Sequence, residues 1–333
     1  MPDSEFFQYL KSKNLEKSKE IILTKLDNEE DLIIIISDLI LFSSLVFRKN
    51  NKHLHPLILI NAIKNIIGDD RKNPSGILLS FFIEYLDLFT LRTDDRKIVD
   101  DILKEGYRES EFVSDLYDAC QEGDVIKIKK ISARIYIVSE KSRAVLDALI
   151  EVILQNVQDS ILFAYHLLRS FQFQKSQNTW TFICSLIQEL QFFPIPEAHK
   201  PSAITPADIK KRIIQFGDVK LFSAVERLWK GDYVRKGSYR RELSYWCHCI
   251  SDNEKMLNQK SQTSFSFKDK NYNFFIKLGE SIILDKKKSL EEKINNLIIL
   301  ESLRSIKKMS KLDELELLEN RFAIIVENEN WKI

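Results

Sequence analysis

Glycine and proline are scarce in this chain. Its 333 residues include only 8 glycines and 7 prolines. Sheet proteins and α/β proteins need more of both residues for tight turns and phosphate loops, so this scarcity argues against those classes. Hydrophobic residues make up 44% of the chain and charged residues 30%, which is the composition of a folded globular protein. We therefore predict an all-α fold.

The short signatures of several enzyme classes are also lacking. The sequence contains no G-x-x-x-x-G-K-[ST] or G-x-G-x-x-G loop, so it shows no recognisable cradle for a nucleotide. It has no H-E-x-x-H zinc motif, no paired C-x-x-C and no G-x-S-x-G turn. These absences leave any cofactor unassigned.

An excess of one charge is missing as well. Lysine and arginine number 50 against 49 acidic residues, and a dedicated nucleic-acid-binding protein usually carries a basic excess. The four cysteines form no disulfide framework, which is typical of a reducing compartment. The first residues, Met1 to Glu5, do not resemble a signal peptide. We expect a cytoplasmic protein.

The longest apolar run is too short to span a membrane. Residues 32–47 read LIIIISDLILFSSLVF, with Asp38 as the only charge. A spanning helix needs about 20 apolar residues. We interpret the run as a central buried helix and expect no membrane insertion.

Helix starts and stops recur along the chain. Pro56 suits a first helical turn, and Gly68 a helix end. The dipeptides Gly123-Asp124 and Gly217-Asp218 each predict one helix end followed by an aspartate that caps the next helix. Such tight turns place neighbouring helices antiparallel. The pattern predicts an antiparallel helical array, either repeat-like or a multi-helix bundle, although no period of 20 to 50 residues is found.

A proline-rich segment interrupts the array. Four prolines, at 194, 196, 201 and 206, lie within residues 192–206 and exclude a continuous helix there. The segment predicts an N-terminal helical array over residues 1–193 and a linker or loop over 194–206. A smaller C-terminal helical domain with a basic first half would then cover 207–333.

Three of the five histidines form the first candidate site. His53 and His55 flank a single residue just before Pro56, and His166 lies in an apolar helical pattern. If the fold brings them together, three imidazoles suit a metal ion, or a general base with its orienting partner. The alternative is that His53 and His55 belong to a solvated loop and that His166 bonds a backbone carbonyl.

A local basic stretch forms the second candidate site. Residues 206–241 hold ten basic and four acidic side chains, a local net charge of +6, with aromatic residues interleaved. Positive charge follows a phosphate backbone and aromatic rings stack on bases, so the stretch predicts a nucleic-acid surface. The alternative is an ordinary solvated helix face. The candidate residues are Lys210, Lys211, Arg212, Arg235, Lys236, Arg240 and Arg241.

Three functions therefore remain open at this point. A helical interaction or scaffold protein that binds a protein partner needs no catalytic motif, so it accounts best for the missing signatures. A helical-bundle enzyme would use a histidine-lined, metal-containing pocket. A nucleic-acid-binding protein would use the basic stretch.

Overall fold

The computed structural model describes residues 4–26, 28–106, 112–252, 261 and 264–332. The chain is almost wholly helical there, which confirms the all-α prediction, whereas a regular repeat is not confirmed. Its first half contains α1 Glu5–Lys11, α2 Leu15–Lys25, α3 Glu29–Ser44, β1 Val46–Phe47, α4 Pro56–Ile67, α5 Gly76–Leu86, β2 Thr90–Leu91, α6 Lys97–Glu105, α7 Val113–Glu122, α8 Val125–Val138 and α9 Ala144–Ile153.

The second half continues the same pattern of packed helices. Two single 3₁₀ turns precede α10 and α11. The elements are η1 Leu154–Asn156, α10 Val157–Phe171, η2 Ser176–Asn178, α11 Thr179–Leu190, α12 Pro206–Phe216, α13 Val219–Lys230, α14 Lys236–Ser251, α15 Phe274–Leu284, α16 Leu290–Met309 and α17 Leu312–Asn328. The two short strands pair antiparallel, with Val46 opposite Leu91.

Hydrogen-bonded caps explain several helix boundaries. Thr205 and Asp208 form a capping box at the start of α12, and Ser289 and Glu292 do the same for α16. Asp218 accepts the backbone N–H groups of Lys220 and Leu221. Gly123 ends α7 in the left-handed region at φ 73°, where a residue without a Cβ is favoured. These boundaries depend on neighbours in the sequence.

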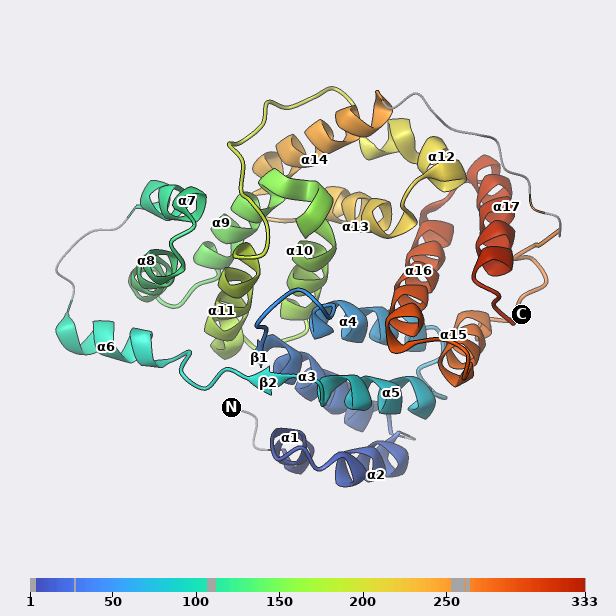
Figure 1. Ribbon diagram of the computed structural model, residues 1–333, viewed down its shortest axis with the longest axis horizontal. Helices are drawn as coiled ribbons and strands as arrows, with labels where there is room; N and C mark the ends of the chain where they lie inside the picture. The colour runs from blue at the N-terminus through green and yellow to red at the C-terminus, as the bar shows by residue number, and fades with distance from the viewer. Residues whose placement is uncertain (1–3, 27, 107–111, 253–260, 262–263, 333) are drawn as a thin grey trace.

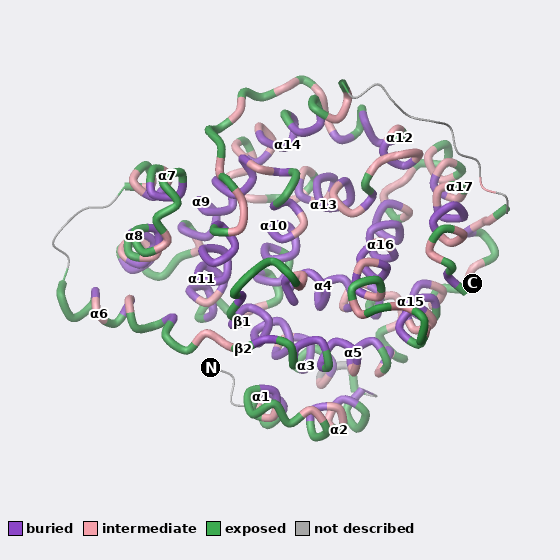
Figure 2. The backbone as a smooth tube through the Cα atoms, in the orientation of Figure 1, coloured by how far each residue is buried: buried purple, intermediate pink, exposed green. Residues whose placement is uncertain are grey.

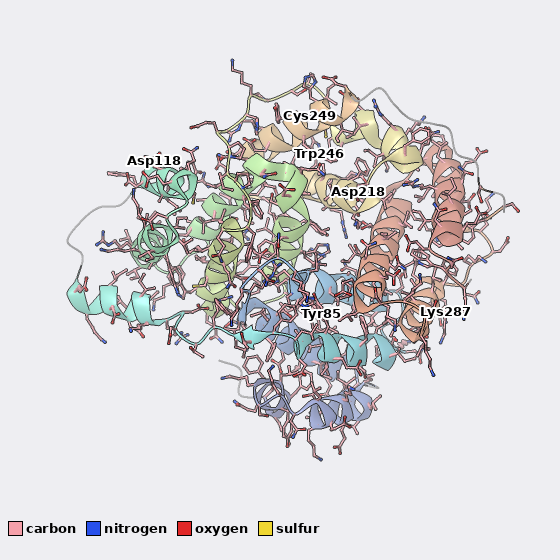
Figure 3. All side chains as sticks on the ribbon, in the orientation of Figure 1. Tyr85, Asp118, Asp218, Trp246, Cys249 and Lys287 are labelled. Carbon is pink, nitrogen blue, oxygen red and sulfur yellow. The ribbon has the colours of Figure 1, made fainter. Side chains whose placement is uncertain are left out.

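Four helices form a closed ring at the centre of the molecule. α4 packs against α10 and α16, and α13 packs against the same two helices (Figure 1). The buried backbone in Figure 2 follows these four helices and the adjoining α3, α9 and α11. Side chains fill the space that the ribbons enclose (Figure 3).

The ring contains helices from both sides of the proline-rich segment. Residues 192–205 form no helix and no strand, and α12 begins at Pro206. α4 and α10 precede this segment, whereas α13 and α16 follow it, and the buried side chains of all four belong to one hydrophobic cluster. The division into two domains stays a prediction from the sequence.

The apolar run at residues 32–47 forms most of α3 and all of β1. The helix ends at Ser44, and most of it is buried, as expected, but Ile33 and Ile34 are each 51% exposed. Burial raises the pKa of the Asp38 carboxyl, which accepts a hydrogen bond from Ser4 Oγ. Throughout the described part of the chain, no helix combines the length and the apolar character that crossing a membrane requires.

Candidate functional site

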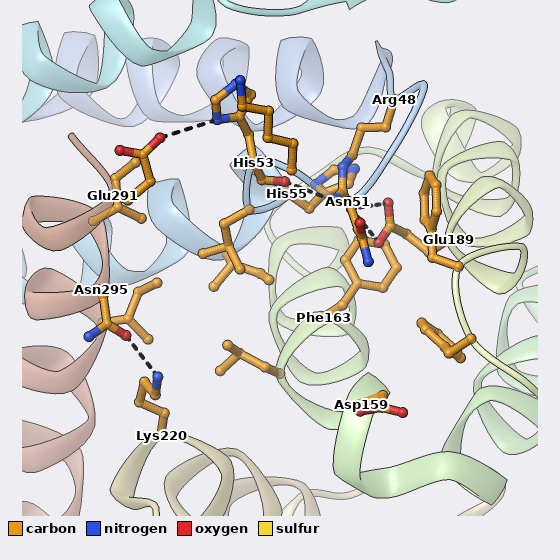
Figure 4. Close-up of a pocket in the computed structure, with 18 of the residues that line it drawn as sticks. Arg48, Asn51, His53, His55, Asp159, Phe163, Glu189, Lys220, Glu291 and Asn295 are labelled. Carbon is orange, nitrogen blue, oxygen red and sulfur yellow. Dashed lines mark hydrogen bonds and ion pairs between the residues drawn. The ribbon is translucent and has the colours of Figure 1, made fainter. Parts of the chain in front are cut away.

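A cavity of about 640 Å³ lies at one end of the central ring. We call it the histidine cavity because His53 and His55 both line it (Figure 4). The first two turns of α4, α10, α13 and α16 contribute Ile58, Leu162, Lys220 and Ile294 to its lining. The volume is that of an ordinary ligand pocket in a protein.

Helix starts place the side chains around this cavity. His55 caps α4 with its own ring: Nδ1 accepts the backbone N–H of Leu57 at 3.1 Å. Asn156 accepts the backbone N–H of Asp159 at the start of α10. Helix N-termini carry partial positive charge, so the four first turns add a weak positive potential to the cavity.

The apolar part of the lining combines aliphatic side chains with three phenylalanines. Phe163 comes from α10, and Phe192 and Phe193 come from the start of the proline-rich segment. The Phe163 ring lies against the His55 ring, with 4.8 Å between their centroids. Ile298 of α16 adds an aliphatic surface. The cavity therefore offers contacts for an apolar group.

His55 is held on both ring nitrogens. The side chain is buried, and its Nε2 lies 3.2 Å from Ser185 Oγ. Burial lowers the pKa of His55 well below its usual value of 6.5, and the nearby Arg48 and Arg92 lower it further. His55 is therefore neutral near pH 7, and its hydrogen bonds position the start of α4.

His53 occupies the rim of the cavity. Its Nδ1 lies 3.8 Å from Glu291 Oε1, across the gap between the loop and α16. Its backbone carbonyl accepts a hydrogen bond of 2.7 Å from Arg48 Nη2. Arg48 also forms a buried ion pair with Glu189, at 2.6 Å between Nη1 and Oε2. This pair anchors the loop that carries both histidines.

The remaining rim carries charges of both signs. Lys220 Nζ donates to Asn295 Oδ1 at 2.8 Å, and Lys52 adds a second ammonium group. Asp159 of α10 and Glu291 of α16 supply carboxylates on opposite sides of the cavity (Figure 4). An apolar floor with a mixed polar rim is the usual composition of a protein-binding surface.

His166 lies deeper in the ring, outside the lining of the cavity. Its Nδ1 accepts a hydrogen bond of 2.8 Å from Asn61 Nδ2, so the ring proton sits on Nε2. Nε2 has no partner among the described residues. Burial lowers the pKa of His166 to about 3. The structure thus brings His53 and His55 to one cavity and separates His166 from them.

The separation bears directly on the metal hypothesis. Among the described residues, no group of three or more His, Cys, Asp or Glu side chains is arranged to hold a metal ion. His53, His55 and His166 each have a different partner instead, namely Glu291, Ser185 and Asn61. The geometry gives the three-histidine metal site no support.

A buried ion pair inside the ring has no counterpart in the sequence analysis. Glu301 of α16 has no exposed surface and accepts two hydrogen bonds from Arg227 of α13. Asn65 of α4 donates a third at 2.8 Å. Arg227 also lies over the Tyr165 ring of α10, at 4.3 Å. The partners are far apart in the sequence, so no local pattern could have indicated them.

The basic stretch of residues 206–241 is largely neutralised by the rest of the protein. Lys210 is buried and pairs with Glu226 at 3.2 Å and with Glu314 at 2.9 Å. Lys211 pairs with Asp313 at 2.7 Å, and Arg212 donates to the carbonyl of Ser251. The lysines and the arginine of α12 therefore face acceptors within the protein.

The basic residues around α14 are engaged in the same way. Arg235 and Arg241 both pair with Glu151, and Arg240 donates to the carbonyl of Trp229 while lying over its ring. Lys236 is half-buried. The aromatic residues of the stretch include Tyr239 and Trp246, which are buried and cannot stack on bases. The geometry gives a nucleic-acid surface here no support.

Comparison with known proteins yields no match to a family model, to a curated protein or to a solved structure. The geometry of this chain is therefore the basis for its proposed function.

Sequence reasoning identified the two histidines of the cavity but not their surroundings. Arg48, Phe163 and Glu189 carried no signal of a site, and Lys220 counted only towards the charge of the basic stretch. A cavity made by four helices depends on which helix faces meet, and the local pattern does not contain that information.

Proposed function

We propose that this chain is a helical interaction protein that binds a segment of a protein partner in the histidine cavity. The observation that carries the proposal is the combination of an apolar lining, which includes three phenylalanines, with a rim of mixed charge at the mouth of a closed helical ring. Anchor pockets of this composition hold the central side chains of a partner, and a polar rim surrounds them.

The lining indicates the chemistry of the bound segment. Phe163, Phe192 and Phe193 suit a large apolar or aromatic anchor, which contributes most of the binding free energy in such contacts. Lys220 and Lys52 suit a flanking acidic residue, and Asp159 and Glu291 suit a basic one. We expect a partner segment with one apolar anchor between oppositely charged neighbours.

The same geometry favours interaction over catalysis. A histidine-based enzyme needs an imidazole whose nitrogen is available to the substrate. Both nitrogens of His55 already have partners, and His166 does not line the cavity. The enzyme hypothesis requires three imidazoles, and of these His53 at the rim is the one that remains.

Peptide selection on the full chain tests the proposal. We expect peptides with an aromatic or large aliphatic anchor to be enriched, and to bind with micromolar affinity in calorimetry. Phe193→Ser removes floor area and Lys220→Glu reverses a rim charge, so each is expected to weaken the binding of the selected peptides by about tenfold. Both side chains are only partly buried, so the variants should fold.

Lys104→Glu is the matched control, because the Lys104 side chain is 78% exposed on α6, which lies away from the central ring (Figure 1). It should leave peptide affinity unchanged. If no peptide is enriched, or if the enriched peptides bind both cavity variants as tightly as the unmodified chain, the histidine cavity is not a partner-binding site.

A further inference from the structure

A second pocket lies at the opposite end of the central ring. The last turns of α4 and α10, the last turns of α16 and the first turns of α3 line its volume of about 530 Å³. The same three ring helices contribute their first turns to the histidine cavity, so the two pockets are separated by the length of the helices. The residues between them include the buried Arg227–Glu301 pair.

The charges of this second pocket are of one sign. Five cationic side chains line it, and none of the described lining residues is an aspartate or a glutamate. We call it the basic pocket; its cations are Lys64, Arg71, Arg169, Arg304 and Lys308. Like charges gathered in a partly enclosed space repel one another unless an anion compensates them.

One nearby carboxylate compensates only part of this charge. Asp69 accepts hydrogen bonds from Arg304 at 2.5 Å and from Lys308 at 2.7 Å, so two cations share one counter-charge. Arg169 donates to the neutral amide oxygen of Gln172 at 2.9 Å. Even with Arg71 left out, four cations face one carboxylate, so a net positive charge remains at the pocket.

Lys64 has no acidic partner among the described residues. Its ammonium group lies 5.2 Å from the centroid of the Phe173 ring. Burial lowers the pKa of Lys64 to about 8, and repulsion from Arg169 contributes to the shift. The groups that act on it are Arg169 from α10, Arg227 from α13 and Glu301 from α16. No carboxylate among the described residues contacts this ammonium group, so an anionic ligand could supply the counter-charge.

The helix ends account for only part of this arrangement. Cations in the last turns of α4, α10 and α16 complement the partial negative charge of the helix C-termini. That effect is worth about 0.3–1 kcal/mol at exposed sites and requires no withdrawal of a lysine from water. The helix ends therefore do not explain why the half-buried Lys64 lies next to an arginine.

An apolar wall completes the basic pocket. Ile33 is 51% exposed and Phe173 is 37% exposed, and both line the pocket beside the cations. Leu32 and Ile36 of α3 extend the same surface. Large apolar side chains left open next to a cationic cluster match a ligand that has an anionic head and an apolar stem.

We propose that the basic pocket binds a phosphate monoester with an apolar substituent. The phosphate group would be held by Lys64, Arg169 and Lys308, because a dianion forms strong charge-assisted hydrogen bonds with ammonium and guanidinium groups. The apolar substituent would lie against Ile33 and Phe173. This site does not depend on the partner-binding role of the histidine cavity.

Calorimetry with phenyl phosphate and inorganic phosphate tests the proposal on the full chain. We expect phenyl phosphate to bind with a Kd below about 1 mM at low salt, and inorganic phosphate several-fold more weakly because it lacks the ring. Lys64→Met and Arg169→Met should each weaken the binding of phenyl phosphate at least tenfold. The distant Lys287→Met should leave it unchanged.

Folding of the variants is checked by circular dichroism, and Lys308→Met provides a second variant because this side chain is 56% exposed. Sedimentation with phosphatidylcholine vesicles, with and without phosphatidic acid, distinguishes the source of the monoester. If the acidic vesicles retain the protein and Lys308→Met abolishes this retention, the monoester is a lipid headgroup. If the protein binds the soluble ester but not the vesicles, the ligand is a free monoester. The proposal is overturned if phenyl phosphate does not bind. It is also overturned if a folded Lys64→Met variant binds phenyl phosphate as tightly as the unmodified chain.

Discussion

Replacing Glu301 by alanine is expected to lower the free energy of unfolding by about 3–5 kcal/mol. Glu301 has no exposed surface, and both of its carboxylate oxygens accept hydrogen bonds from Arg227. The substitution leaves the guanidinium group of Arg227 without a counter-charge inside the helical ring, and Asn65 loses an acceptor. Urea unfolding of the full chain at pH 7, followed by circular dichroism, measures the loss.

A double variant separates the cost of the unpaired charge from the value of the pair. Glu301→Leu combined with Arg227→Met removes both charges, and we expect it to be markedly more stable than Glu301→Ala. The exposed pair of Lys211 and Asp313 is the matched control, because Asp313→Ala should leave stability unchanged within error. A Glu301→Ala variant that loses less than about 1 kcal/mol would contradict the expected role of this pair.

Mild acid is expected to destabilise the protein through its two buried histidines. His55 and His166 are neutral when the chain is folded, because burial depresses the pKa of both imidazoles. In the unfolded chain each takes up a proton below pH 6.5. The free energy of unfolding therefore has its full value above pH 6.5, and it decreases as the pH falls towards the pKa of each imidazole in the folded chain. His166 should contribute a loss of about 2 kcal/mol between pH 7 and pH 5, and His55 should add to it in the same direction.

The pH dependence is measured as the urea midpoint from pH 7 to pH 5. His166→Phe should be less pH-sensitive than the unmodified chain by about 2 kcal/mol over this interval, whatever its absolute stability. His248→Gln is the control, because the His248 side chain is 51% exposed on α14. Equal pH dependence in His166→Phe and the unmodified chain would show that this imidazole does not govern acid stability.

The starts and ends of several helices were predictable from short stretches of sequence. Pro56 opens α4, Thr205 and Pro206 open α12, and the capping box at Ser289 opens α16. These features depend on contacts within one helical turn, between groups that are neighbours in the chain. The proline-rich segment was predictable for the same reason, since a proline ring excludes helix locally.

The roles of single side chains were less predictable. His55 was expected to belong to a site, and the structure places it at the cavity, but its ring caps α4 and bonds Ser185. His166 was grouped with it, yet its partner is Asn61. The basic stretch has a local excess of positive charge in the sequence, whereas Glu151, Asp313 and Glu314 neutralise much of it from other elements. Each difference arises from a partner that is distant in sequence.

The sequence by itself determined that this chain is helical and where many of its helices begin and end, because hydrogen bonding and capping act between near neighbours. Tertiary structure alone decided that α4, α10, α13 and α16 close a ring with a mixed-charge cavity at one end and a cationic pocket at the other. Cavity shape, burial of charge and the pKa of each histidine depend on which faces of distant helices meet, and the packing of the whole chain determines those contacts.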